Sequence, residues 1–583
     1  LWKPSRQARG VVIYKQEEID TIKNKALEVQ SQLDQESGNS ATSLRAAASR
    51  ELQITPHAIW GLQHNWLDQE NNSAACTFTK LMAGSVTLSG GLNAYGLAIK
   101  PNVNDVSAKI ATLSARNDLK TIVFVNQKSH AISTSKKISI ALAANIIPTD
   151  EEVLKWDALE LELGDLKHSL LIKGSSAVPH NASMLRMERE LSECMYKREN
   201  GAMVIVATPT LAQGLNLPAQ LAILAGDKRA EVESGRRESL EAHELLNAAA
   251  RAGRAGHLAN GIVLLVPEPV LSFPESQQLN SRVVQKLQAL IPENDRCVEI
   301  SDPLGVILDR ISEGNIADND VIYMVNRLAT LNDTENDDNT LFNLERSFAA
   351  FRLRNNGEEQ KFNNQLVGLT HLVEAEANDD IDQSLSILAS QSGLPPIVLF
   401  RLKQKIEQDR GNLPSSIFDW IIWLISWLTS DFEARVLLLS DVRSSILGAT
   451  GKNKNGEITE EVLNELIPGI YSWISGLPLR EVELALGGEP DSNTQTKKSC
   501  PRVRELISSV LPRGLSFIMG LITRVVTEVD PYDAQENLSP DVVDSLSASI
   551  RLGYDTPEKL NFSFANPSIL TRVGAHQAYS QEQ

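Results

Sequence analysis

The spacing of hydrophobic residues changes about halfway along this chain. In the first half, short apolar runs such as Val204–Ala207 and residues 262–266 are followed by small or polar residues, which is typical of buried parallel strands. Beyond residue 266, apolar residues recur at helical spacing between polar breaks near residues 332–340, 355–364 and 486–500. The pattern predicts an α/β region, with a parallel sheet and flanking helices, followed by a mostly α-helical region.

The same pattern predicts several further elements. A helix is expected over residues 17–35. The glycines that follow it predict tight turns or insertions, and they are Gly84, Gly90, Gly91 and Gly96. After the sheet we expect a small winged-helix-like unit, and then helical bundles that contain residues 462–486 and 503–526.

One apolar segment, residues 417–429 (IFDWIIWLISWLT), is too short to span a bilayer and contains Asp419. Trp420, Trp423 and Trp427 form a single stripe at helical spacing. Such a stripe is more often part of a core than a platform on which bases stack, and we expect core here.

Candidate chemistry lies where the predicted strands end. Thr208 and Thr210 leave the carboxyl end of Val204–Ala207, where open α/β sheets place their ligand sites. Residues 238–252 predict a helix whose end presents Arg251 and Arg254 on one face, and two guanidinium groups there suit a triphosphate. Taken singly, each of these polar residues is better explained as a cap of a helix or strand. The ordered set favours a site.

Both segments resemble motifs of a known family. Residues 208–219 (TPTLAQGLNLPA) resemble motif V of superfamily 2 helicases, and residues 247–261 (NAAARAGRAGHLANG) resemble motif VI of their DExH, Ski-like branch. The preferred register places Asn247 at the family's glutamine, and Arg251 and Arg254 at its two arginines. A competing register uses residues 253–256 and puts His257 where the second arginine belongs. The first register retains both charges.

Other landmarks of the family occur in the required order. Residues 121–126 (TIVFVN) resemble the strand of motif IV, residues 177–190 resemble the segment before motif V, and residues 2–9 resemble the linker that enters the second RecA-like domain. The resemblance implies four regions: residues 1–119 as linker and N-terminal part of that domain with insertions, 120–270 as its core, 271–340 as the winged-helix-like region and 341–583 as helical C-terminal domains.

The resemblance also implies a function, which is ATP-driven movement along nucleic acid. Arg254 would be the arginine finger and Arg251 its partner, as the second lobe of a two-lobe motor supplies charge to the γ-phosphate. The residues that would bind ATP or couple its state are Gly214, Asn216 and Asn247. Those that would touch the nucleic-acid backbone are Thr208, Thr210, His180 and Asn126. ATP and Mg²⁺ are the implied cofactors, with the metal held mainly by the first RecA-like domain, and no metal site is expected in this chain.

Two parts of a complete motor do not occur before motif IV. The sequence has neither a GxxxxGK[ST] phosphate loop nor a DExH box there, and residues 448–452 (GATGK) lack the required spacer. The chain also begins at Leu1. We therefore expect it to be the C-terminal portion of a longer helicase, which hydrolyses ATP only with a first RecA-like domain.

Composition narrows the class of protein further. With 583 residues, 42% of them hydrophobic, the chain can bury several domain cores. Its four cysteines form no CxxC pair, so we expect neither a disulfide framework nor structural zinc, and a reducing cytoplasmic location without a membrane partner. The net charge of −18 argues against a general polyanion binder, although basic residues crowd around motifs V and VI. These are Arg186, Arg189, Lys197, Arg198, Lys228, Arg229, Arg236 and Arg237.

Three functions stay open at this point. The chain is a helicase or translocase portion, a non-hydrolysing clamp or scaffold subunit of a defence or repair complex, or part of another superfamily 2 motor. The expected partner is single-stranded or partly duplex nucleic acid, with DNA favoured slightly over RNA. The residues themselves do not choose between DNA and RNA, because 2′-hydroxyl recognition has no sequence signature in this fold. A resemblance to helicases of Hachiman-type bacterial antiphage systems would add antiviral defence and a nuclease partner.

Overall fold

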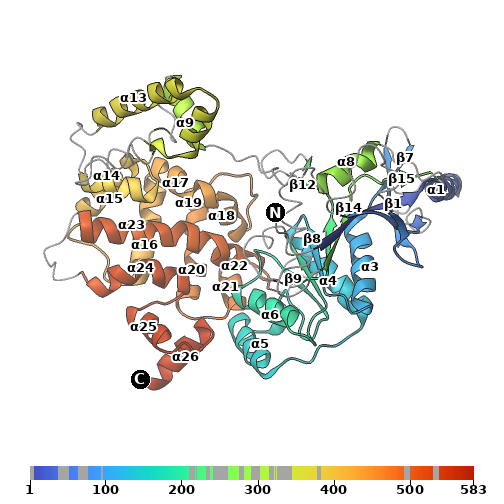
Figure 1. Cartoon of the computed structure of the whole chain (residues 1–583). Coiled ribbons are helices and arrows are strands. Elements are labelled where there is room, and N and C mark those ends of the chain that lie inside the picture. Colours follow the sequence, from blue (N-terminus) through green and yellow to red (C-terminus); the bar gives the residue numbers. More distant parts are fainter. Residues whose placement is uncertain are drawn as a thin grey trace. The chain divides into compact units, whose positions relative to one another are not determined.

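The computed structural model of the chain divides into two compact units (Figure 1). Unit 1 comprises residues 1–298 and 491–499, and unit 2 comprises residues 299–490 and 500–583. The residues that the structure describes are 6–36, 52–62, 77–93, 96–208, 217, 219–230, 237–239, 260–274, 281–290, 303–313, 321, 324, 344–376, 383–490, 499–529 and 538–583.

Unit 1 is built on a sheet whose central strands are parallel, as predicted. In spatial order they are β1 (Arg6–Lys15), β14 (Asn260–Val266), β11 (Leu221–Ala225), β8 (Thr121–Val125), β10 (Val204–Ala207) and β9 (Ala177–His180). On the outer side of β1 the sheet continues with two antiparallel strands, β3 (His57–Leu62) and β4 (Thr77–Lys80), and β15 (Ser272–Phe273) also pairs with β1.

The central strands are short and apolar because the sheet is covered on both faces. Every residue of β8, β10 and β11 is buried. Val123, Val206 and Ile223 face one side of the sheet and belong to one core with residues of α3 (Val103–Arg116) and α4 (Lys128–Leu142). The apolar runs of the sequence therefore become strands because both of their faces must leave water.

The chain changes direction across the sheet at β8. From β8 it runs through α4 to the edge strand β9, and returns through α6 (Arg186–Lys197) to β10, which lies between them. It then crosses to β11, on the opposite side of β8, and later adds β14. Such a reversal is a topological switch point, and in open α/β sheets the ligand crevice lies outside the carboxyl ends of the strands at this point.

Two predictions about local structure in unit 1 were wrong. Glu238 does not begin a helix, because Arg237–Ser239 is strand β13, which pairs antiparallel with β12 (Lys228–Ala230) and sets Glu238 opposite Arg229. The remainder of that predicted helix lies outside the described residues. Gly90, Gly91 and Gly96 are not turn residues. Gly90 and Gly91 belong to β6 (Ser89–Asn93), and Gly96 begins β7 (Gly96–Lys100), which pairs with β6.

The helix and one of the turns predicted early in unit 1 are confirmed, and the structure adds further elements. The helix predicted over residues 17–35 is α1 (Gln16–Glu36), and Gly84 lies in a bend. A short pair, β2 (Gln53–Ile54) and β5 (Val86–Thr87), adds to the same core. Helix α5 (Asp150–Leu163) begins with a capping box between Thr149 and Glu152.

Unit 2 is helical, as predicted. Its helices are α9 (Pro303–Ser312), α12 (Phe348–Asn355), α13 (Glu359–Glu376), α14 (Gln383–Ser392), α15 (Pro396–Gln408), α16 (Ile417–Ser430), α17 (Phe432–Leu439), α18 (Arg443–Ala449), α19 (Glu460–Asn464), α20 (Ile467–Ile474), α21 (Leu479–Ala485), α22 (Pro501–Glu505), α23 (Ser516–Arg524), α24 (Pro540–Leu552), α25 (Pro557–Ala565) and α26 (Arg572–Glu582). The polar break predicted over residues 355–364 is shorter than expected, because α13 begins at Glu359.

The tryptophan stripe of α16 is core, as expected. Trp420 and Trp427 are buried, and Trp423 donates from Nε1 to Asp409 Oδ2 at 2.7 Å. A second apolar stretch, Pro501–Thr527, is long and apolar enough to cross a membrane, yet 61% of its most apolar window is buried inside the protein. It forms α22, η4 (Leu506–Leu515), α23 and part of η5 (Val525–Val529), and packs against α18 and α24 as a core helix.

The winged-helix-like region is not confirmed. Between residues 271 and 340 the described elements are β15, α8 (Ser281–Leu290) and α9. By its contacts α8 belongs to unit 1, where it packs on β1, and α9 belongs to unit 2.

Candidate nucleic-acid interface

Three neighbouring parallel strands end in polar residues at one edge of the sheet. Asn126 follows β8, Thr208 follows β10 and Asn181 follows β9. In the ladder, Ala207 of β10 pairs with Phe124 of β8 and with His180 of β9. The register thus brings these residues to the carboxyl edge, beside the switch point.

Thr208 is fixed against the neighbouring strand. Only 8% of its surface is exposed, and its N–H donates to the carbonyl of His180 at 3.3 Å. The other predicted residues of motif V, Thr210, Gly214 and Asn216, lie outside the described residues. Of the predicted motif V contacts, the structure thus describes only Thr208, where the segment leaves β10.

Asn181 holds the carboxyl end of β9 to the start of α4. Its Oδ1 accepts from the backbone N–H of Ser183 at 2.9 Å and from the Ser183 hydroxyl at 2.6 Å. Its Nδ2 donates to the carbonyl of Lys128 at 3.3 Å. Asn181 was not predicted as a site residue, although its place directly after a predicted strand is the same signal that indicated Thr208.

His180 is buried and paired. It is 8% exposed, and its Nε2 lies 3.1 Å from Glu193 Oε1 on α6. Burial lowers the pKa of His180, and nearby Arg189 adds to this, while Glu193 acts in the opposite direction. At neutral pH the ring is thus mainly neutral, and Nε2 is the nitrogen that can donate to Glu193.

On the other side of β8, a second set of polar contacts closes the edge. Asn126 donates from Nδ2 to the carbonyl of Lys228. Gly226, with φ of 99°, turns the chain after β11, and its N–H donates to the carbonyl of Val266 at 2.9 Å. A Cβ on Gly226 would lie 3.0 Å from Asn126 Nδ2, so both the backbone angle and the close approach favour glycine.

Asp227 anchors the base of the β12–β13 hairpin. It is 3% exposed, its Oδ1 accepts from the N–H of Glu268 at 3.1 Å, and it forms an ion pair with Lys286 of α8. Sequence reasoning missed this residue. Its position after the apolar run Leu221–Ala225 was the signal that could have found it.

The basic residues expected near motif V are partly neutralised. On α6, Arg186 pairs with Glu190 at 2.7 Å and Lys197 with Glu193 at 3.3 Å. Arg198 pairs with the buried carboxylate of Glu152 at 2.8 Å. In contrast, Lys128 is exposed at the first turn of α4. Lys128, an exposed cation at this edge, is not among the basic residues that the sequence singled out.

The predicted ATP-facing residues are Asn247, Arg251 and Arg254, and they lie outside the described residues, as does His257. The chain returns to described structure in β14, which lies between β1 and β11 and contains the run of residues 262–266 that was predicted as a strand. Among the described residues, no group of three or more His, Cys, Asp or Glu side chains could hold a metal ion.

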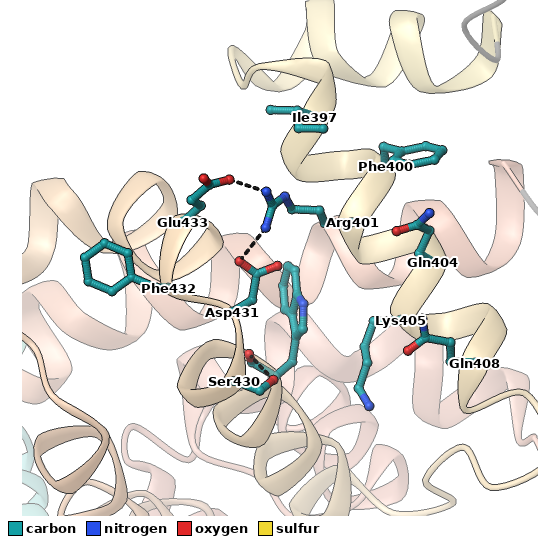
Figure 2. A pocket seen from close by; sticks show the side chains of 11 residues that line it. Ile397, Phe400, Arg401, Gln404, Lys405, Gln408, Ser430, Asp431, Phe432 and Glu433 are labelled. Carbon is teal, nitrogen blue, oxygen red and sulfur yellow. Dashed lines mark hydrogen bonds and ion pairs between the residues drawn. The ribbon is translucent and has the colours of Figure 1, made fainter.

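Unit 2 has a groove of its own, with a cavity volume of about 640 Å³, between α15 and α17. Figure 2 shows Arg401 directed at two carboxylates, Asp431 at 3.1 Å and Glu433. Phe400 and Phe432 line the groove and are partly exposed. Because its arginine is already paired with two acids, the groove offers less to a phosphate than the edge of unit 1.

An open parallel sheet with polar residues along its carboxyl edge at a switch point is typical of nucleotide-binding and nucleic-acid-binding domains. Comparison with known proteins narrows this class. Part of the chain is 31% identical over 188 residues to the ATP-dependent DNA helicase Hel308 of Pyrobaculum calidifontis, a match that covers 31% of this chain and 25% of that protein. Another part-chain match, 30% identical over 200 residues, is to the U5 small nuclear ribonucleoprotein 200 kDa helicase of Homo sapiens, and covers 32% of this chain and 9% of that protein.

A plant protein gives a similar match. The DExH-box ATP-dependent RNA helicase DExH13 of Arabidopsis thaliana is 27% identical over 173 residues, which cover 28% of this chain and 8% of that protein. No protein-family model matches the chain. The chain thus spans a quarter or less of these relatives, and the matched part is homologous to superfamily 2 helicases.

Proposed function

We propose that this chain supplies the second RecA-like lobe and the C-terminal domains of an ATP-dependent helicase or translocase. One observation carries the proposal: in a chain homologous to ATP-dependent helicases, Asn126, Thr208 and Asn181 line the carboxyl edge of three neighbouring parallel strands. A row of polar residues at the carboxyl edge of a parallel sheet is where such folds place ligand sites, and polar contacts there suit the phosphate and sugar that a motor must grip without regard to sequence.

The strand would be held at this edge. Thr208, Thr210, His180 and Asn126 are the proposed contacts, and they would act through hydroxyl, amide and main-chain groups. The substrate would be single-stranded or partly duplex nucleic acid. The relative at 31% identity is named a DNA helicase and the one at 27% an RNA helicase, so we favour DNA.

ATP would bind between this lobe and a first RecA-like lobe. That first lobe would supply the phosphate loop and most ligands of Mg²⁺. Arg254, with Arg251 beside it, would stabilise the charge that develops on the γ-phosphate, and Asn247, Gly214 and Asn216 would couple the nucleotide to the strand. The motif V and motif VI resemblances support these roles.

The biological setting is part of the same proposal. We place the protein in the cytoplasm, without a membrane partner, as a helicase of antiphage defence of the Hachiman kind that works with a nuclease.

A second function is favoured by one observation, which is that the sequence before residue 121 contains no GxxxxGK[ST] phosphate loop. This second function is that of a clamp or scaffold, which holds nucleic acid without hydrolysing ATP.

ATP turnover separates the two functions. We expect the 583-residue chain by itself to hydrolyse no ATP above background, and a protein that joins it to a first RecA-like lobe to hydrolyse ATP when single-stranded nucleic acid is added. Robust turnover by the chain alone would contradict the division of labour between lobes. Strand binding without stimulated turnover in the two-lobe protein would favour the clamp.

A further inference from the structure

The charge of unit 1 is distributed unevenly. Residues 77–149 contain eight Lys or Arg and two Asp or Glu, hence a net charge of +6, whereas the whole chain carries −18. This region includes α3 and α4, which pack against each other on one face of the sheet (Figure 1). An acidic protein thus carries one positively charged segment, and two packed helices display much of it.

The cations of these helices point into solvent. Five basic residues of α3 and α4 are exposed, and we call them the α3–α4 basic face: Lys109, Arg116, Lys128, Lys136 and Lys137. Among the described residues, the one carboxylate that pairs with any of them is Asp105, which binds Lys137. Lys109 and Arg116 donate instead to the carbonyls of Ser85 and Ala141, contacts that leave their positive charge uncompensated.

The basic face begins at the proposed strand site. Lys128 is the first residue of α4, and its carbonyl accepts the side-chain hydrogen bond from Asn181 at the carboxyl edge. From Lys128 to Lys137 the helix rises roughly 14 Å at about 1.5 Å per residue. A nucleic acid held at the carboxyl edge could thus continue along α4 and meet several cations.

The residues between the cations indicate which kind of nucleic acid fits. Ser129 and Ser133 are exposed on α4. The Ser129 hydroxyl can donate to a phosphate oxygen, whereas the Ser133 hydroxyl donates to the carbonyl of His130 at 3.3 Å. Neither α3 nor α4 contains Phe, Trp or Tyr, the side chains on which unpaired bases stack. A face with cations and hydroxyls but without a stacking platform suits the backbone of a duplex rather than a single strand.

We propose that the α3–α4 basic face binds the phosphate backbone of the duplex that adjoins the single strand held at the carboxyl edge. This inference rests on the proposed function, because it assigns the duplex part of the same substrate. The duplex lies along α4 and is bound without regard to its sequence. Each lysine that contacts a phosphate adds to the salt dependence of binding.

The test compares two fluorescein-labelled probes, a single-stranded oligonucleotide and the same oligonucleotide extended by a duplex, in anisotropy titrations across a salt series with the two-lobe protein. The variant Lys109→Gln/Lys136→Gln should bind the extended probe at least about tenfold more weakly at low salt. For this probe the slope of log K against log salt should also fall by about 2. Binding of the single-stranded probe should not change.

Matched variants separate local contacts from net charge. Lys23→Gln/Lys25→Gln removes two exposed charges from α1 and should leave both probes unaffected. Lys109→Arg/Lys136→Arg keeps the charge and should bind as the wild type does.

Several outcomes would overturn the inference. Equal losses for both probes, or no loss for the extended probe, would show that the duplex does not use this face, while the proposed function stands. If the variant instead loses binding to polyglutamate and still binds both probes as the wild type does, the α3–α4 basic face binds an acidic protein and not a duplex. If the wild type binds neither probe, the proposed function is contradicted, and so is this inference, which rests on it.

Discussion

His180 Nε2 lies 3.1 Å from Glu193 Oε1, and this contact joins the carboxyl end of β9 to the helix that follows it. Because the carbonyl of His180 also accepts from the N–H of Thr208, the same residue links two strands of the candidate interface. The protonation state of one buried ring therefore bears on the geometry of the edge.

We expect unit 1 to lose stability as pH falls below about 6.5, the ordinary pKa of histidine. Burial lowers the pKa of His180, so the unfolded ring takes up a proton at a higher pH than the folded ring does. In the window between the two pKa values the unfolded state binds more protons, and acid favours unfolding. Hydrogen exchange of β9 and α6, corrected for intrinsic rates, should show faster opening at about pH 5.5 than at about pH 7.5.

His180→Gln supplies the control for this pH dependence, since glutamine can still donate to Glu193 but does not titrate. The variant should lose part of the acid sensitivity of β9 and α6. An unchanged pH dependence in the variant would assign the effect to other groups, such as His57, whose pKa burial also lowers.

Arg572 should be essential to the stability of unit 2. It is 6% exposed, donates to the carbonyls of Trp473 and Leu477, and lies with its guanidinium carbon 4.2 Å from the centre of a Trp473 ring. Arg572→Met leaves both carbonyls without this donor and should lower the free energy of unfolding by about 2–4 kcal/mol. Arg572→Lys should restore little, because an ammonium group lacks the fork that reaches two carbonyls.

Urea unfolding of unit 2 gives the measurement, with Arg551→Met as the matched control, since Arg551 is exposed on the neighbouring helix α24. The control should change stability by less than about 0.5 kcal/mol. If both variants lower the free energy of unfolding by the same amount, the buried contacts of Arg572 do not stabilise unit 2 more than an exposed arginine does.

Strands and core helices could be predicted because their signal is local. Val204–Ala207 is an apolar run that ends at a polar residue, which predicts a buried strand. Trp420 and Trp427 recur at helical spacing, which predicts one buried face of a helix. Thr208 followed from the same logic, since parallel strands bring their carboxyl ends to one edge. Asn126 was placed by the family resemblance, and its end-of-strand position agrees with that logic.

What could not be predicted depends on partners distant in sequence. Glu238 is a residue type that favours the first turn of a helix. Its backbone instead pairs with that of Arg229 in the neighbouring strand, and this pairing makes it part of a hairpin. Gly90 and Gly91 form a strand because Ala98 and Ile99 lie opposite them. The ion pair of Asp227 with Lys286 also joins segments far apart in the chain, and no spacing rule relates them.

The register of motif VI can be decided by substitution in the two-lobe protein. If Arg254 is the arginine finger, Arg254→Ala should lower ATP turnover by about 1000-fold or more while leaving folding intact. Arg254→Lys should recover little, because a point charge lacks the planar fork. Steady-state ATPase rates and circular dichroism are the measurements.

The alternative register makes the opposite prediction for two neighbouring residues. In the preferred register Arg251→Ala should impair turnover and His257→Ala should have a small effect. Loss of activity in His257→Ala with normal turnover in Arg251→Ala would establish the competing register.

The last prediction concerns how the strand is held at the carboxyl edge. If Thr210 contacts the backbone of the nucleic acid, Thr210→Ala should weaken binding about equally for unrelated single-stranded sequences, whereas loss of a base contact would discriminate between sequences by roughly 1–3 kcal/mol per position. Anisotropy titrations of several labelled oligonucleotides should also show affinity that falls steeply with salt despite the net charge of −18, because local cations make the contacts. Thr527→Ala, at an exposed threonine of unit 2, is the control and should bind as the wild type does. A flat salt response, or a loss confined to one sequence, would favour a sequence-specific binding module over a motor, since a motor must release and rebind every sequence that it passes.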